Sequence, residues 1–160
     1  MRPLALLAAT VAVLAAAALA VAARADATGP PWGPETPNFN LEVILRPTAG
    51  GNGFGHVKFR QPNDAATVVY LDTWVRDLEP NNSYLLQRAV DTNIDGNCTS
   101  SGWLPLGQIS TDDRGTGSAA LSRILTASVG TAFDIHFRVV DANTSAVVLE
   151  SACYQFRVSL

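Results

Sequence analysis

The strongest constraint on the fold of this chain is a strict alternation of apolar and polar side chains that begins at residue 39. Between residues 39 and 46 one side of the segment is apolar and the other is mostly polar. The apolar side holds Phe39, Leu41, Val43 and Leu45, and the other side holds Asn40, Glu42 and Arg46. Successive side chains of a strand point to opposite faces, so this pattern predicts a half-buried β-strand.

Seven further runs have strand-like composition and are separated by clusters of Gly, Asn, Asp and Pro. They span residues 54–61, 66–77, 83–90, 116–124, 132–140, 145–150 and 152–160. No segment has the 3.6-residue periodicity of a helix. Eight strands with turns at short intervals predict an all-β fold, an antiparallel sandwich or barrel.

The N-terminal segment predicts export. Arg2 is followed by 21 residues without a charge, eleven of them alanine, and the run ends on two small-x-small motifs at residues 23–25 and 25–27. We expect residues 1–27 to be a cleaved signal peptide, which makes the protein secreted or extracytoplasmic and leaves no stable membrane insertion. An uncleaved membrane helix is the alternative, since about 20 apolar residues can span a bilayer. Residues 28–38 hold four prolines and two glycines, which predicts a linker to a single domain over residues 39–160.

The net charge of the chain beyond residue 27 argues against a nucleic-acid partner. Removing Arg2, Arg24 and Asp26 from 11 basic and 14 acidic side chains leaves 9 and 13, a net charge of −4. Lys58 is the only lysine, so no basic stripe is expected to release counterions from a phosphate backbone.

Cys98 and Cys153 are the only two cysteines. An even count in an exported chain predicts a disulfide, and closing a 55-residue separation stabilises the fold by about 4 kcal/mol in the chain-entropy model. Two buried free thiols are the alternative. A zinc site is disfavoured, because thiolate sites typically need four ligands in close pairs.

Five segments, in order along the chain, resemble the copper/zinc superoxide dismutase family. They are residues 55–61, like its second strand; 77–82, like the turn before its copper-binding strand; 91–102, like its disulfide loop; 106–115, like its Leu-Gly segment; and 151–153, like its second half-cystine. The similarity covers about residues 41–160. It implies an eight-stranded Greek-key barrel in which Cys98–Cys153 staples a long loop to the last strand.

The same resemblance does not imply the activity. The family binds copper on a His-x-His strand, and the equivalents here are Leu86 and Arg88 when counted from Leu78, or Gln87 and Ala89 when counted from Cys98. Neither pair contains a ligand. His136 is the only residue that matches a family copper ligand, and Cu²⁺ needs several nitrogen ligands held together.

Two further departures point the same way. Pro105 stands where the family has a zinc aspartate, and Glu150 stands where it has an arginine that attracts superoxide. A carboxylate on an acidic domain repels an anionic substrate. We therefore expect no metal, no cofactor and no superoxide dismutase activity.

The two histidines, His56 and His136, alternate with polar neighbours and are expected at the surface. On this basis, substituting His136 is expected to change stability by less than about 0.5 kcal/mol. Neither histidine lies in a Gly-rich nucleophile loop, so a Ser-His-Asp site is not indicated. Four aspartates could offer oxygen ligands to Ca²⁺, but the spacing lacks the bidentate glutamate of an EF-hand, and turn formation explains them better. They are Asp91, Asp95, Asp112 and Asp113.

Two aromatic features remain. Residues 78–84 fit the Leu-x-Pro-x-x-x-Tyr corner of fibronectin type III domains, in which the tyrosine hydroxyl bonds to upstream backbone. Tyr70 and Trp74 share the polar side of their predicted strand and are candidates for a binding surface.

These observations give three functional hypotheses. The first is a non-catalytic exported β-barrel domain that serves binding or cell-envelope structure. The second is a copper-binding protein or a superoxide dismutase with an unrecognised ligand set. The third is a polymer- or protein-recognition module that uses Tyr70 and Trp74.

Overall fold

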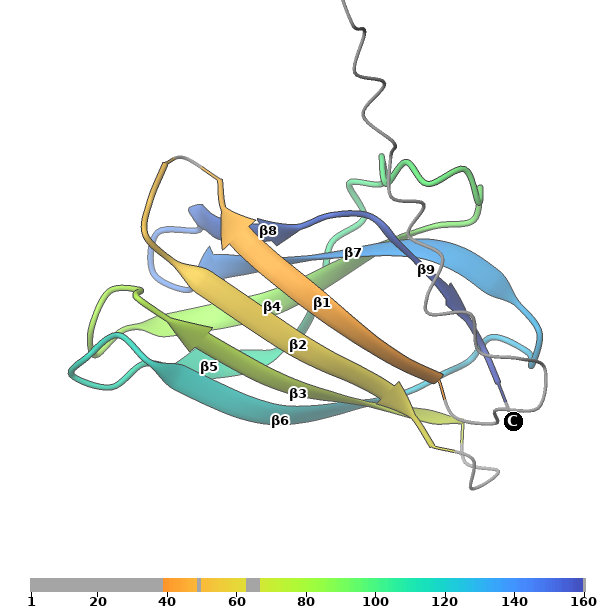
Figure 1. Ribbon diagram of the computed structural model, residues 1–160, viewed down its shortest axis with the longest axis horizontal. Coiled ribbons are helices and arrows are strands. Elements are labelled where there is room, and N and C mark those ends of the chain that lie inside the picture. The colour runs from red at the N-terminus through yellow and green to blue at the C-terminus, as the bar shows by residue number, and fades with distance from the viewer. Residues whose placement is uncertain (1–38, 49, 63–66, 160) are drawn as a thin grey trace, which may run out of the picture.

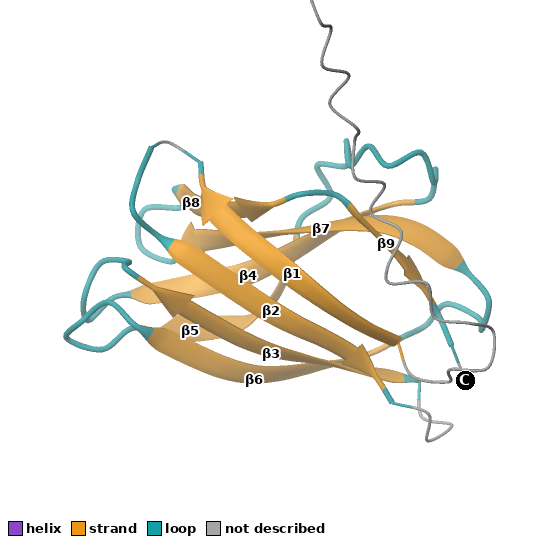
Figure 2. Cartoon of the chain, in the orientation of Figure 1, coloured by secondary structure: helices purple, strands orange, loops and turns teal. Residues whose placement is uncertain are grey.

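The computed structural model describes residues 39–48, 50–62 and 67–159, and in that part of the chain every regular element is a β-strand (Figure 2). The predicted signal peptide, residues 1–27, and the predicted linker, residues 28–38, lie outside the described residues. The strands are β1 (Phe39–Pro47), β2 (Phe54–Gln61), β3 (Val68–Arg76), β4 (Ser83–Asp91), β5 (Leu104–Ser110), β6 (Gly117–Ile124), β7 (Ala132–Asp141), β8 (Val147–Ser151) and β9 (Tyr154–Arg157). The described residues contain no helix long and apolar enough to span a membrane.

The strands form one antiparallel sheet in the order β5-β4-β7-β8-β1-β2-β3-β6, which curls into a nearly closed barrel. Figure 1 shows two layers, with β1, β2, β3 and β6 in front of β4, β5 and β7. The connections β3–β4 and β6–β7 each join strands that are not neighbours, as in a Greek key. The expected all-β, eight-stranded antiparallel barrel is confirmed.

The barrel stays open along one seam. Strands β5 and β6 are the two ends of the strand order and are joined by a turn in which Thr111 and Gly117 form a single bridge. Beyond that turn, Arg123 on β6 donates hydrogen bonds to the carbonyl oxygens of Pro105 and Leu106 on β5. One guanidinium therefore spans the seam where strand pairing is missing.

The core is built by the inward residues of both layers. In β3 the burial alternates strictly, with Val69, Leu71 and Val75 inside. Phe59 lies between the layers, with its ring centroid 6.1 Å from Phe137 and 4.8 Å from Phe156. Aromatic pairs at these edge-on geometries add about 0.5–1.5 kcal/mol each beyond their burial.

Two strands depart from the sequence expectation. Strand β5 was not expected, because a bulge opposite Leu86 and Gln87 breaks its register and leaves Leu106 and Ile109 buried three residues apart instead of two. The expected run at residues 152–160 shortens to β9, which pairs only with β7 and lies off the main strand order.

The tyrosine corner is present. The backbone N–H of Glu79 donates to the hydroxyl oxygen of Tyr84 at 3.0 Å, and the Tyr84 side chain is almost fully buried. A tyrosine corner of the fibronectin type therefore occurs in a barrel whose Greek-key architecture was expected from another resemblance.

Candidate functional site

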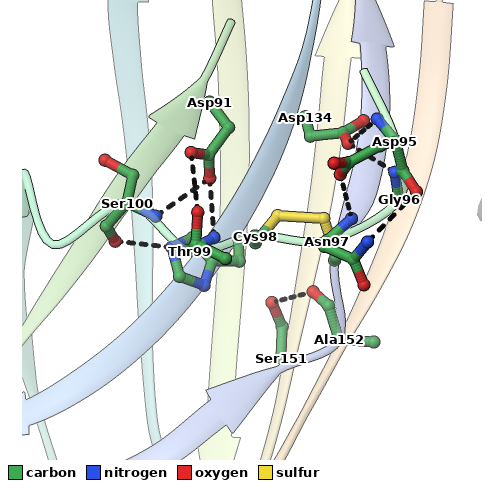
Figure 3. Close-up of a disulfide and its surroundings, with 12 residues drawn as sticks. Asp91, Asp95, Gly96, Asn97, Cys98, Thr99, Ser100, Asp134, Ser151 and Ala152 are labelled. Carbon is green, nitrogen blue, oxygen red and sulfur yellow. Dashed lines mark hydrogen bonds between the residues drawn. A yellow bond between two sulfur atoms is a disulfide. The ribbon is translucent and has the colours of Figure 1, made fainter. Parts of the chain in front are cut away.

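The loop between β4 and β5 is tied to the outer side of the barrel by a disulfide (Figure 3). Cys98 in this loop is bonded to Cys153, with Cα atoms 5.3 Å apart, which confirms the predicted pairing. Cys153 occupies the break between β8 and β9, so the bond fixes the loop at the point where β7 changes partners. A disulfide is consistent with an oxidising, extracytoplasmic environment.

Two carboxylates hold the same loop from either side. Asp134 on β7 accepts hydrogen bonds from the backbone N–H groups of Asp95 at 3.1 Å and Gly96 at 2.7 Å, both at one oxygen. Asp91 at the end of β4 accepts from the backbone of Thr99 and Ser100 at 2.9 and 3.0 Å. Figure 3 shows the two anchors on either side of the disulfide.

The predicted turn roles of the other aspartates are also present. Asp95 accepts the N–H of Asn97 at 2.9 Å, and Asp112 accepts those of Arg114 and Thr116 at 2.9 Å each. These backbone bonds, led by the one from Thr116, hold the pKa of Asp112 below its usual value. Turn formation thus accounts for Asp95 and Asp112, and loop anchoring accounts for Asp91, whereas Asp113 makes no hydrogen bond within the described residues.

The expectation that His136 is a surface residue is wrong. Its side chain does lie on the outward face of β7, but only 7% of the residue is exposed. The ring of Trp103 covers it with centroids 4.4 Å apart, and its Nε2 lies 3.3 Å from the carbonyl oxygen of Ser100. The alternation along a strand predicts which way a side chain points, but it does not predict what packs over it. The loop that contains Trp103 and covers His136 could therefore not be predicted from the sequence of β7.

The residues around His136 do not fit a copper or zinc site. Ala89 is opposite His136 and Gln87 is opposite Arg138 in the β4–β7 register, so Gln87 and Ala89 share its face whereas Leu86 and Arg88 point inward. Pro105 offers no ligand atom in its side chain. Among the described residues, no group of three or more His, Cys, Asp or Glu side chains could hold a metal ion.

Next to His136, Arg138 stacks on Trp103 and donates to Gln87. Its guanidinium carbon lies 4.0 Å from the Trp103 ring centroid, and its Nε is 2.8 Å from Gln87 Oε1. Burial lowers the pKa of Arg138, and the facing Glu150 partly offsets this. Glu150, which the resemblance to the dismutases aligns with an arginine, is thus opposed by a cation across β7 and β8.

Tyr70 and Trp74 lie on the opposite layer, on the outward side of β3, and are 39% and 38% exposed. Each ring makes a cation–π contact with an arginine. Arg60 lies 6.0 Å from the Tyr70 centroid, and Arg76 lies 5.9 Å from that of Trp74. Arg60 is also paired with Asp72 at 2.5 Å, midway between the two rings.

A third ring, which sequence reasoning missed, completes this surface. Phe54 on β2 meets Trp74 edge-on at 6.1 Å, and both Arg46 and Arg76 lie 5.2 Å from its centroid. We call the outward side of β1, β2 and β3 that carries these residues the outer aromatic face. Phe54 begins its strand and is paired with Arg76 in the β2–β3 register, so only the strand register brings it here.

The outer aromatic face is basic, although the chain beyond residue 27 is acidic. It carries four of the nine basic side chains, Arg46, Lys58, Arg60 and Arg76. Its acidic side chains are Glu42, which pairs with His56, and Asp72, which pairs with Arg60. Arg46 and Lys58 form no ion pair among the described residues, although Glu150 lies opposite Arg46 in the β1–β8 register and Glu42 and Asp72 lie opposite Lys58. Arg76 has only Asp77 at 3.6 Å, beyond its strand.

Comparison with known proteins adds no assignment: no family model matches the chain, and no curated protein is similar to it at a significant level.

Proposed function

We propose that this protein is a secreted, non-catalytic binding domain on a dismutase-like barrel, and that the outer aromatic face binds an acidic polysaccharide. The predicted signal peptide and the disulfide support an extracytoplasmic location. The observation that carries the proposal is the alternation of exposed rings and guanidinium groups along β2 and β3.

Each part of that surface suits one part of an acidic sugar polymer. Exposed aromatic rings offer flat apolar area to the apolar face of a pyranose ring. Arginines bind carboxylates through two parallel hydrogen bonds, and their cation–π contact with the rings holds them close by. Tyr70 and Trp74 are four residues apart on one strand, about 13 Å, so a linear polymer can engage both.

A non-catalytic role rests on the surroundings of His136. Its neighbours Ala89, Gln87 and Trp103 provide no second strong metal ligand, and it is covered rather than open to a substrate. The competing copper-enzyme hypothesis makes a distinct claim. Copper-loaded protein with a dismutase rate that disappears in His136→Ala would support that hypothesis over ours.

The binding test uses the protein purified from the extracytoplasmic fraction and calorimetry with polygalacturonate. We expect binding that weakens with added salt, because exposed charges are screened. Trp74→Ala and Arg76→Gln are each expected to weaken it at least about tenfold, 1.4 kcal/mol. The matched controls are Leu104→Ala, an exposed apolar residue elsewhere, and Arg114→Gln, an exposed turn arginine, and both are expected to bind as the parent does.

Three other polymers separate the competing partners. Neutral dextran is expected to bind weakly, because it leaves the arginines without an anion. Poly-glutamate binding as tight as polygalacturonate would assign the face to an acidic protein instead of a sugar, and tighter binding of a single-stranded oligonucleotide would assign it to nucleic acid. Unchanged polygalacturonate binding in both Trp74→Ala and Arg76→Gln would refute the proposed surface.

A further inference from the structure

The barrel interior contains a cavity of about 260 Å³ at the end opposite the tyrosine corner. It lies between the two layers and is lined mainly by apolar side chains. They include Val69, Leu71, Leu106, Phe133 and Ile135. It is therefore an apolar chamber inside the barrel and separate from the outer aromatic face, which lies on the other side of β2 and β3.

The cavity opens to solvent. Ile124, at its rim, is 75% exposed, although it is a large apolar residue at the end of a strand. Thr126 and Thr131 of the β6–β7 connection are also exposed and line the same rim. A small molecule can thus enter without unfolding the barrel.

Among the described residues that line this chamber, Arg88 is the one charged side chain without a hydrogen-bond or ion-pair partner. Arg88 alternates along β4 with Tyr84 and Leu86, which are fully buried inside the barrel, so Arg88 points inward as they do. Within the described part of the chain, Arg88 makes no hydrogen bond and no ion pair. Its counterpart on the cavity wall, Arg123, is instead bonded to the carbonyl oxygens of Ser122, Pro105 and Leu106.

The electrostatics of Arg88 favour an anion. Desolvation, and then the positive charge of Arg123, lower the pKa of Arg88. The guanidinium keeps its charge in proteins, so the half-buried Arg88 loses part of its hydration beside a second cation. A buried charge is stable when it is paired and hydrogen-bonded, which an anionic group at the cavity would accomplish.

We propose that this cavity binds a single-chain amphiphile with an anionic head, its acyl chain between the layers and its carboxylate at Arg88. A chamber of about 260 Å³ has room for one acyl chain of medium length. That is the size of a medium-chain fatty acid. A two-chain phospholipid is too large for it.

The test is calorimetry of the protein purified from the extracytoplasmic fraction with decanoate, below the concentration at which decanoate forms micelles. Burial of the acyl chain predicts a negative heat-capacity change. Acetate, which has the head without the chain, is expected not to bind. Decanol, which has the chain without the charge, is expected to bind at least tenfold more weakly than decanoate.

Variants assign the two parts of the site. Arg88→Gln is expected to weaken decanoate binding at least tenfold and to leave decanol binding unchanged, whereas Arg88→Lys retains most of the affinity. Ala127→Phe places a ring in the chamber from its loop wall and is expected to abolish binding of both ligands. Arg76→Gln on the outer aromatic face is the matched control and is expected to bind decanoate as the parent does.

Several results would overturn the proposal. Folded parent protein that does not bind decanoate would refute it, as would decanoate affinity unchanged in Arg88→Gln or in Ala127→Phe. Loss of decanoate binding in Arg76→Gln would move the site to the outer aromatic face. Anionic phospholipid vesicles that bind through Arg88 more tightly than decanoate would refute the free single-chain ligand.

Discussion

Removing the carboxylate of Asp134 should release the disulfide loop from β7 at one of its two carboxylate anchors. The side chain is 1% exposed, and a single oxygen accepts the N–H groups of Asp95 and Gly96 at 3.1 and 2.7 Å. Hydrogen bonds to charged groups contribute about 1.5–3 kcal/mol each. Asp95 and Gly96 are themselves exposed, so water can replace the lost acceptor, and we expect Asp134→Ala to cost about 2 kcal/mol in total rather than the full sum.

The isosteric variant separates charge from geometry. Because both donors converge on one oxygen, the amide oxygen of Asp134→Asn can accept both bonds without the charge. Neutral bonds are roughly half as strong, so Asp134→Asn should cost about 1 kcal/mol. Urea unfolding of the three proteins gives these differences, and amide exchange at Gly96 should accelerate in the same order.

The control is Asp113→Ala, an exposed turn aspartate that makes no hydrogen bond within the described residues, and it should stay within about 0.5 kcal/mol of the parent. Equal stability of Asp134→Ala and Asp113→Ala would refute the idea that this carboxylate anchors the loop. Equal losses in the alanine and asparagine variants would show that charge, and not hydrogen-bond geometry, carries the effect.

Four shorter predictions follow from other contacts. Replacing both cysteines by serine should lower the unfolding free energy by about 2–4 kcal/mol, measured by urea titration, and alkylation mass spectrometry of the parent should find no free thiol. Gly115→Ala should lower the unfolding free energy by more than about 2 kcal/mol in the same titration, because φ is +74° and a Cβ would lie 2.1 Å from the backbone oxygen of Leu78. In the control Gly96→Ala the Cβ would enter open space, so this variant should cost only the strain of its positive φ. His136→Ala should cost about 1–2 kcal/mol, a correction to the small effect expected from sequence, and His56→Ala, at the half-exposed site paired with Glu42, should cost less. Hydrogen bonds lower the pKa values of Asp112 and Asp141, so the stability that these carboxylates contribute should be complete above about pH 5 and be lost as the pH falls through about 4 and below. In a plot of the urea midpoint against pH, Asp141→Asn should therefore show a smaller decrease at acid pH than the parent does.

The strands were predictable where alternation is regular, and the exceptions have a common cause. β3 keeps period two along its whole length and β1 keeps it from Leu41 to Arg46, so their faces could be assigned from residues alone. β5 has a bulge, which moves Leu106 and Ile109 to a spacing that period two does not recognise. The burial of His136 depends on Trp103, which comes from a loop more than thirty residues earlier, and no local pattern encodes that contact.

Only some residues of the two candidate sites could be predicted from the sequence. Tyr70 and Trp74 follow from the alternation of one strand, but Phe54 and Arg46 join them only through the pairing of β1 with β2 and of β2 with β3. The inward position of Arg88 could also have been recognised from the sequence. It continues the inward series of Tyr84 and Leu86, and a cation in an inward series marks either a buried ion pair or a ligand site.

Net charge was the least informative sequence feature for predicting a ligand, because it averages over the whole surface. A ligand contacts only one part of that surface. Of the nine basic side chains beyond residue 27, four lie on the outer aromatic face, and two more, Arg88 and Arg123, line the cavity behind it. The acidic side chains are concentrated instead in turns and loop anchors, where Asp91, Asp112 and Asp134 are already bonded to backbone N–H groups. A carboxylate engaged in such bonds repels an approaching anion only weakly at the distance of the opposite layer, since exposed charges more than about 8–10 Å apart are largely screened at physiological salt. An acidic chain can therefore carry the two anion sites proposed above, one on each side of the same sheet.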